Sequence, residues 1–203
     1  MKIFCVGRNY ADHAKELGNA VPEDPVIFMK PKTALLQAGM PFYYPEFSNE
    51  LHHEIELVLR IAKNGKYIAE KGAAKYYDAI TVGIDFTARD VQAELKKKGL
   101  PWEKAKAWDN SAIIGNWVDF TPEMQKNPIH FSLLKNEEKV QEGNSNQMIF
   151  SFNYLIAHIS QYFSLNIGDL VFTGTPAGVG ECVVGDVLKG YLENDKMFEI
   201  EVK

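Results

Sequence analysis

The sequence has few cysteines, no excess of basic residues and no long apolar run. Only Cys5 and Cys182 occur in 203 residues, far apart and without metal-type spacing, so we expect a protein from a reducing compartment. The net charge of -5 argues against a nucleic-acid-binding surface, and the one basic run, at 96–98, is expected to be a solvated helix end. Because a secretory signal and a membrane-spanning segment are both missing, we expect a soluble, cytoplasmic protein that does not bind membranes.

Tandem repeats, linkers and low-complexity segments are also missing, so residues 1–203 are expected to form a single domain. Strand-like segments outnumber helical ones, which predicts a mostly β (α+β) fold with a few short helices. Strands are predicted at 2–6, 26–30, 51–61, 81–85 and 129–136, with hairpins at 63–66 and 137–150. Helices are predicted at 8–18, 70–80, 88–98 and 153–164.

The strand predicted at 51–61 carries two acidic residues, Glu54 and Glu56. Residues two apart in a strand point to the same face, so these carboxylates should lie side by side, with His52 next to them. Two carboxylates so close repel each other unless a positive charge lies between them, and a divalent cation would supply it. The same pattern also occurs on the solvated face of antiparallel strands, so this segment alone leaves both interpretations open.

A third acidic residue, Asp85, ends another predicted strand just before a predicted helix. Thr87 and Asp90 resemble a capping box at the start of that helix. Arg89 and Gln92 lie three residues apart on one helical face, near the helix N-terminus, where the dipole favours anions. A carboxylate followed by Arg and Gln has the layout of a site that binds a metal and an acid.

A possible general base is His13, three residues before Glu16 in a predicted helix with Asn9 as its N-cap. A hydrogen bond between the two side chains would orient the imidazole and raise its basicity, although such pairs are also frequent on exposed helices. Lys30 and Lys32 could bind an anion or face solvent. Lys104 or Lys106 could point into a pocket, although their residue type and position alone favour a solvent-facing side chain.

The glycine-rich segment at 173–180 lacks the lysine and the spacing of a phosphate-binding loop, but Thr173 and Thr175 could bind a carboxylate there. Together, Glu54, Glu56 and Asp85 offer three hard oxygen ligands without cysteine or closely spaced histidine. This set favours Mg²⁺ or Mn²⁺ over Zn²⁺ and indicates Lewis-acid chemistry on an oxo acid.

Six segments resemble the fumarylacetoacetate hydrolase family, most closely its short acylpyruvase and oxaloacetate decarboxylase branch. They are GRNYADH (7–13), FMKP (28–31), LHHEIEL (51–57), DFTARDVQ (85–92), KKKGLPWEKAK (96–106) and GDLVFTGTPAGVG (168–180). The resemblance implies a mixed β-sandwich roll, usually a homodimer, in which a divalent metal binds a 2-oxo acid. It also implies the role of each candidate: metal ligands Glu54, Glu56 and Asp85; substrate contacts Arg89, Gln92 and Thr175; an active-site lysine, Lys106; and a catalytic pair on a mobile lid, His13 and Glu16.

The resemblance implies an enzyme that cleaves the carbon–carbon bond of short 2,4-dioxo acids, an acylpyruvate hydrolase acting through an enolate. Oxaloacetate decarboxylation, oxaloacetate keto–enol tautomerisation and isomerisation of 2-hydroxyhepta-2,4-diene-1,7-dioate are the alternative reactions, and a metal-binding scaffold module is the non-enzymatic alternative. Two departures from the family pattern concern the substrate. Residues 1–11 contain no Asp or Glu to serve as a fourth acidic ligand, and Ala107 and Trp108 replace a small hydroxyl residue and Phe.

Overall fold

The computed structural model describes residues 1–16, 18 and 20–203, and most of its regular structure is β. The strands are β1 (Ile3–Gly7), β2 (Val26–Lys30), β3 (Leu51–His53), β4 (Ile55–Ile61), β5 (Tyr77–Asp85), β6 (Thr87–Ala88), β7 (Ala112–Ile114), β8 (Val118–Asp119), β9 (His130–Lys135), β10 (Glu138–Asn144), β11 (Leu170–Phe172), β12 (Gly180–Cys182), β13 (Val187–Leu192) and β14 (Asp195–Glu201). The helices are α1 (Ala11–Glu16), α2 (Arg89–Lys97), α3 (Glu103–Lys106) and α4 (Phe152–Tyr162), with short 3₁₀ turns η1 (Lys32–Ala34), η2 (Glu70–Lys75) and η3 (Ser145–Gln147). The predicted mostly β fold with a few short helices is confirmed. None of the helices in the described ranges is long and apolar enough to cross a membrane.

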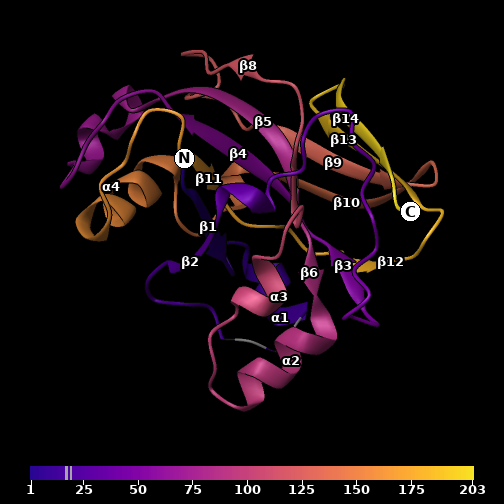
Figure 1. Cartoon of the computed structure of the whole chain (residues 1–203). Coiled ribbons are helices and arrows are strands. Elements are labelled where there is room, and N and C mark those ends of the chain that lie inside the picture. Colours follow the sequence, from indigo (N-terminus) through magenta and orange to yellow (C-terminus); the bar gives the residue numbers. More distant parts are fainter. Residues whose placement is uncertain (17, 19) are drawn as a thin grey trace.

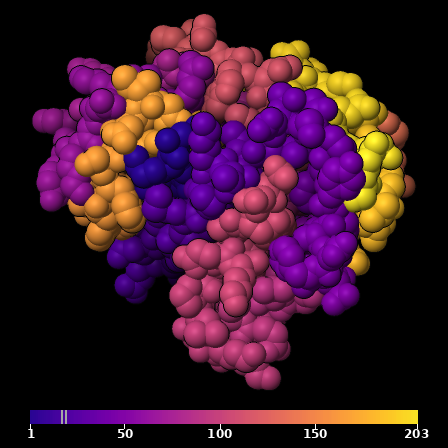
Figure 2. Space-filling model, in the orientation of Figure 1, coloured from indigo at the N-terminus to yellow at the C-terminus, as the bar shows by residue number. Residues whose placement is uncertain are grey.

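The strands form three sheets. The largest has the order β2-β1-β11-β4-β5-β7, with β8 also paired to β5; a second has the order β10-β9-β13-β14, and a third β12-β3-β6. The main core contains Leu57 and Leu59 of β4 together with Phe131 and Leu133 of β9, so it lies between the first two sheets. Helices α2 and α3 lie together beside β3 and β6, away from this core (Figure 1). In the space-filling view the segment that carries them projects from one edge of the molecule (Figure 2).

The strand predicted at 51–61 is interrupted at Glu54. Its first part, β3, pairs with β12 and β6, whereas its second part, β4, pairs with β5 and β11. Since β4 is central in the large sheet, both of its faces are buried, with Leu57 in the main core and Val58 packed with Phe172 on the other side. Glu56 is therefore only 2% exposed and does not lie on a solvated face.

Three local predictions outside the pocket were wrong. The segment at 63–66 does not form a tight hairpin, because β4 and β5 are joined by a longer connection in which Gly65 pairs with Leu165. The predicted helix at 70–80 is the 3₁₀ turn η2, followed by the start of β5 at Tyr77. Asn9 does not cap α1, since its side chain instead bonds to the backbone of Phe150 and Thr173. Residue 17 of the predicted first helix lies outside the described residues.

Candidate active site

One pocket lies at the junction of β4, β5 and helices α2 and α3. Several of its lining residues were predicted from the sequence: His13, Glu54, Glu56, Asp85, Arg89, Gln92, Lys106 and Thr175. Glu16 contacts the ring of His13, which itself lines the pocket. Segments from residue 6 to residue 175 thus contribute to one site.

The floor of the pocket is formed by the three carboxylates. Strand pairing brings them together, because Ile55 of β4 lies opposite Ile84 of β5 and the Asp85 amide donates to the Glu54 carbonyl. One oxygen from each of Glu54, Glu56 and Asp85 lies within 4.8 Å of the others, and all three residues are buried. Burial and the neighbouring Asp85 and Glu54 raise the pKa of Glu56 well above its usual range.

Lys106 binds two of these carboxylates at once. Its Nζ lies 2.8 Å from both Glu54 Oε2 and Asp85 Oδ2, and 2.5 Å from Thr87 Oγ1. Burial opposes the charged amine, but Asp85 and Glu54 outweigh it and raise the pKa of Lys106. The Thr87 hydroxyl is thus bonded to Lys106 and does not cap α2. The N-cap of α2 is Ala88, without a side-chain bond, so the predicted capping box is wrong.

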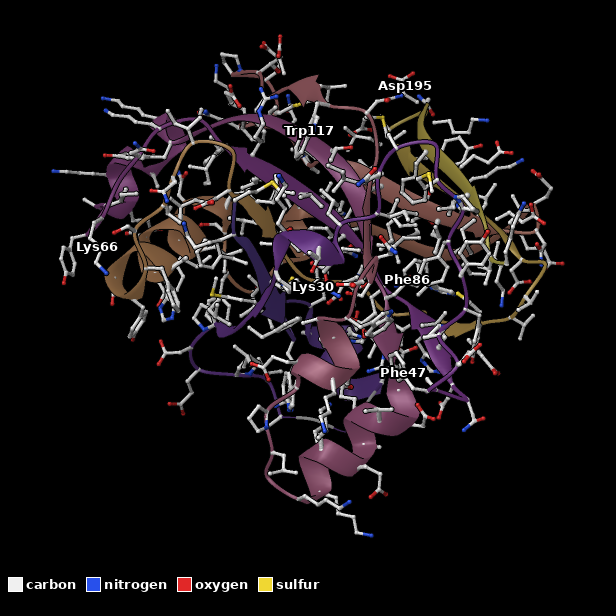
Figure 3. The ribbon with its side chains drawn as sticks, viewed as in Figure 1. Lys30, Phe47, Lys66, Phe86, Trp117 and Asp195 are labelled. Carbon is white, nitrogen blue, oxygen red and sulfur yellow. The ribbon has the colours of Figure 1, made fainter. Side chains whose placement is uncertain are left out.

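Lys30, which the sequence left undecided, is fully buried beneath the pocket. Figure 3 shows it near the centre of the molecule, close to Phe86 and above helices α2 and α3. Its Nζ lies 2.8 Å from Asp85 Oδ1, and it donates to the carbonyl of Ser111 and to its hydroxyl, each at 3.0 Å, and to the carbonyl of Lys106. An ammonium group has three protons, and these three acceptors use them. Asp85 Oδ1 therefore accepts no hydrogen bond from the described residues but is paired with the Lys30 ammonium group as a buried ion pair.

Arg89 fixes the remaining carboxylate oxygen of Glu54. One guanidinium nitrogen lies 2.5 Å from Glu54 Oε1, a second donates to Gln92 Oε1 at 2.7 Å, and Nε donates to His52 Nδ1 at 3.3 Å. Burial raises the pKa of Glu54, but Lys106 and Arg89 outweigh it, so this carboxyl stays ionised well below its usual pKa.

His13 and Glu16 form the predicted pair on α1. His13 Nδ1 lies 3.3 Å from Glu16 Oε2, and the backbone amide of Gly178 donates to both oxygens of the same carboxylate. Glu16 therefore links α1 to the glycine-rich segment. His13 is 4% exposed, and burial lowers its pKa although Glu54 and Glu16 oppose the shift. A neutral imidazole at neutral pH can accept a proton.

The two threonines of the glycine-rich segment have different environments. Thr173 donates to the carbonyl of Leu57 and is used by the sheet, whereas Thr175 lines the pocket. Thr175 Oγ1 accepts a hydrogen bond from Gln141 Nε2 at 2.9 Å. The hydroxyl proton of Thr175 thus remains free to bind an acid. Sequence analysis missed Gln141, because a glutamine in a predicted hairpin carries no local sign that it will be buried.

The donor set fits a hard divalent cation. Three carboxylates converge without a cysteine or histidine among the donors, which suits a cation that prefers oxygen ligands. Glu54, Glu56 and Asp85 are therefore the residues that would hold the ion.

The family profile described as "Fumarylacetoacetate (FAA) hydrolase C-terminal" matches residues 2–203. The chain belongs to the fumarylacetoacetate hydrolase family. Within this family it is 43% identical over 190 residues to an oxaloacetate tautomerase of Escherichia coli, covering 92% of this chain and 86% of that protein. A mitochondrial oxaloacetate decarboxylase of Dictyostelium discoideum is 41% identical over 203 residues, with 98% and 93% coverage.

Solved structures of fumarylacetoacetate hydrolase family members share the fold. Fumarylpyruvate hydrolase from Pseudomonas aeruginosa, solved with Mn²⁺ and pyruvate, superposes with a TM-score of 0.93 at 35% identity, covering 100% of this chain and 89% of that one. The predicted fold of the family's C-terminal domain is confirmed. These relatives are enzymes, which argues against the scaffold alternative.

Proposed function

We propose that this protein is a metal-dependent enzyme that interconverts the keto and enol forms of oxaloacetate. The observation that carries the proposal is the convergence of three buried carboxylates and the His13–Glu16 pair on one pocket. Two relatives that are 43% and 41% identical over most of this chain are named for tautomerisation and for decarboxylation of oxaloacetate, which supports this substrate.

The pocket's polar side chains would orient the acid. Arg89 and Gln92, already bonded to each other, present donors from α2, and the free hydroxyl proton of Thr175 can bind a carboxylate oxygen. Lys106, held in its charged form by Glu54 and Asp85, adds a fixed positive charge near the oxo group. Donors and charges that are positioned before the reaction favour the negative charge that develops on an enolate.

His13 would move the proton. Its buried, neutral imidazole takes a proton from C3 of the keto form, and the charged ring is then stabilised by Glu16. Return of a proton to the oxygen gives the enol, and the reverse sequence gives the keto form. Mg²⁺ or Mn²⁺ at the three carboxylates would act as a Lewis acid that polarises the 2-oxo group.

Cleavage of 2,4-dioxo acids is the second candidate reaction. The similarity to the fumarylpyruvate hydrolase favours it. His13, which lines the pocket, could take a proton from a water molecule and not from C3 of the substrate. The hydrolytic step would break the bond between C3 and the attacked carbon. This reaction uses the same carboxylate floor and differs only in what His13 deprotonates.

A panel of substrates separates these reactions. Purified protein loaded with Mg²⁺ or Mn²⁺ is mixed with enol-oxaloacetate, keto-oxaloacetate, acetylpyruvate or a hydroxyheptadienedioate. Loss of the enol absorbance, release of CO₂, release of pyruvate and isomerisation are then followed separately. We expect tautomerisation to have the highest kcat/KM; faster cleavage of acetylpyruvate than tautomerisation would replace the first candidate by the second.

We further propose that residues 1–203 act as one catalytic domain in a cytoplasmic homodimer. Cys5 and Cys182 are buried free thiols, which supports a reducing compartment. Light scattering coupled to size-exclusion chromatography tests the oligomeric state. A mass equal to the 22.9 kDa chain would contradict the dimer.

A further inference from the structure

The mouth of the pocket carries more positive charge than its floor needs. On α2, Arg89, Gln92 and Lys96 are three and four residues apart and share one helical face, and all three line the pocket. Arg8, which follows β1, lines the same pocket. The run at 96–98 was predicted to be a solvated helix end, but only Lys97 and Lys98 are exposed, whereas Lys96 is half-buried.

Two of the three carboxylates of the floor already have cationic partners. Glu54 and Asp85 pair with Lys30, Lys106 and Arg89. Glu56 accepts a hydrogen bond from the Gly174 amide, so the three cations leave the floor without excess negative charge before a metal ion binds. The positive charge of a divalent cation would be offset there by the 1-carboxylate of the acid and by the developing enolate. The positive charges of Arg8 and Lys96 are additional to these and are not paired with the carboxylates of the floor.

Neither Arg8 nor Lys96 forms an ion pair or a side-chain hydrogen bond with any residue in the described part of the chain. Lys96 Nζ lies 5.3 Å from the centroid of the Trp102 ring, a contact that holds the amine at the pocket without neutralising it. Burial, together with Arg89 and Arg8, lowers the pKa of Lys96 to about 8. Two cations that repel each other in a half-buried pocket are stabilised when an anion binds between them.

The backbone at Arg8 supports a functional reason for this arrangement. Arg8 has φ of 61°, in the left-handed region that a non-glycine residue seldom adopts, directly after Gly7. Strained backbone of this kind tends to persist where it positions a side chain for binding or catalysis. Here it accompanies a guanidinium that lines the pocket.

We propose that Arg8 and Lys96 form a subsite for the second carboxylate of a dicarboxylic 2-oxo acid. The inference rests on the proposed function, in which the first carboxylate and the oxo group occupy the floor. In oxaloacetate the second carboxylate lies two carbons beyond the oxo carbon, toward the mouth of the pocket. The subsite would make the enzyme select oxaloacetate over acids with an uncharged tail.

A comparison of two substrates tests this selection. Arg8→Gln and Lys96→Gln remove one charge each, and Lys97→Gln is the matched control, since Lys97 is the next residue of α2 and is exposed. Each pocket variant should lower kcat/KM for oxaloacetate by about 10-fold to 100-fold, the effect of losing one charge-assisted hydrogen bond, and change acetylpyruvate cleavage by less than about 3-fold. Equal losses for both substrates, or no loss for oxaloacetate, would overturn the subsite.

A binding measurement separates this inference from the proposed reaction. Titration calorimetry with the metal-loaded protein compares pyruvate, which has no second carboxylate, with 3,3-difluorooxaloacetate, which cannot enolise. We expect the dicarboxylate to bind about 10-fold or more tightly than pyruvate, with the advantage lost in Lys96→Gln and kept in Lys97→Gln. This result would hold even if no reaction were found with oxaloacetate. Equal affinity of the wild-type protein for the two acids would contradict the subsite whatever the reaction.

Discussion

Gln141 Nε2 donates a hydrogen bond of 2.9 Å to Thr175 Oγ1 and thereby connects β10 to the substrate pocket. The same amide donates to the carbonyl of Pro176, while its oxygen accepts from the backbone of Ile55 and lies 2.8 Å from His53 Nδ1. These partners leave the amide only one consistent orientation. Gln141 is therefore a positioning residue that directs the Thr175 hydroxyl proton toward the pocket.

Thr175→Val should raise KM for oxaloacetate by about 10-fold while changing kcat by less than about 3-fold, because it removes a substrate donor and leaves one N–H of the Gln141 amide without an acceptor. Thr175→Ser keeps the hydroxyl and should restore KM. Steady-state kinetics on both variants, with Gln141→Leu in a double-mutant cycle, measures the coupling of the pair. Additive effects of Thr175→Val and Gln141→Leu would show that the two residues act separately.

The grouping of Glu54, Glu56 and Asp85 could be predicted from the sequence, because they lie in a short, ordered set of motifs. Sequence analysis missed contacts that only the fold creates. Gln141 bonds to Thr175, 34 residues later in the chain, and to Ile55, 86 residues earlier, and nothing local predicts these contacts. The sequence could not decide whether Lys30 is buried or exposed, because its burial depends on an ion pair with Asp85, which only the fold creates.

The interruption of the strand at Glu54 could not be predicted from the pattern of apolar and polar residues either. The residues of 51–61 alternate as one strand would, but the chain passes from the three-stranded sheet into the large sheet at this residue. Alternation reports which faces are apolar and does not report which neighbour a strand pairs with. The capping box at Thr87 failed for a related reason, because a buried lysine, Lys106, competes for the threonine hydroxyl.

Replacing His13 by Ala should affect hydrolysis more than tautomerisation. Attack by water needs a base at the moment of attack, whereas the C3 proton of oxaloacetate is already acidic between two carbonyl groups. We expect a loss of roughly 100-fold or more in acetylpyruvate cleavage and a smaller loss in tautomerisation. Lys15→Gln, on the same helix but largely exposed, is the control and should leave both rates unchanged. Equal losses for the two reactions in His13→Ala would contradict these separate roles.

The pH profile of the wild-type enzyme tests the state of His13. A base must be unprotonated, and burial lowers the pKa of His13 below its ordinary value of 6.5. The acid limb of kcat/KM should therefore have its midpoint below pH 6.5, with activity lost as the pH falls through that midpoint. A midpoint above 6.5 that disappears in His13→Ala would mean that Glu16 and Glu54 outweigh burial.

Protein stability should also fall on the acid side, because of His53. Burial lowers the pKa of His53 from 6.5 to about 4, so between these values the unfolded state binds a proton that the folded state does not. This group alone should lower the free energy of unfolding by about 2 kcal/mol between pH 6.5 and pH 5. The free energy of unfolding, measured with urea, should vary less with pH in His53→Asn, which cannot titrate. His130→Gln, at an exposed position, should behave as the wild type. An unchanged slope in His53→Asn would contradict this assignment.

The central claim is that the three buried carboxylates hold a divalent cation on which turnover depends. Chelator-treated protein is titrated with Mn²⁺, binding is followed by calorimetry, and enol-oxaloacetate turnover is measured at each addition. The wild type should be inactive in chelator and should regain activity in proportion to bound Mn²⁺. Glu56→Gln should bind Mn²⁺ at least about 100-fold more weakly and stay inactive, while Glu142→Gln, at an exposed position of β10, should match the wild type. Full activity in chelator would contradict the account, and Mn²⁺ binding at Glu56 without turnover of any 2-oxo acid would favour a scaffold.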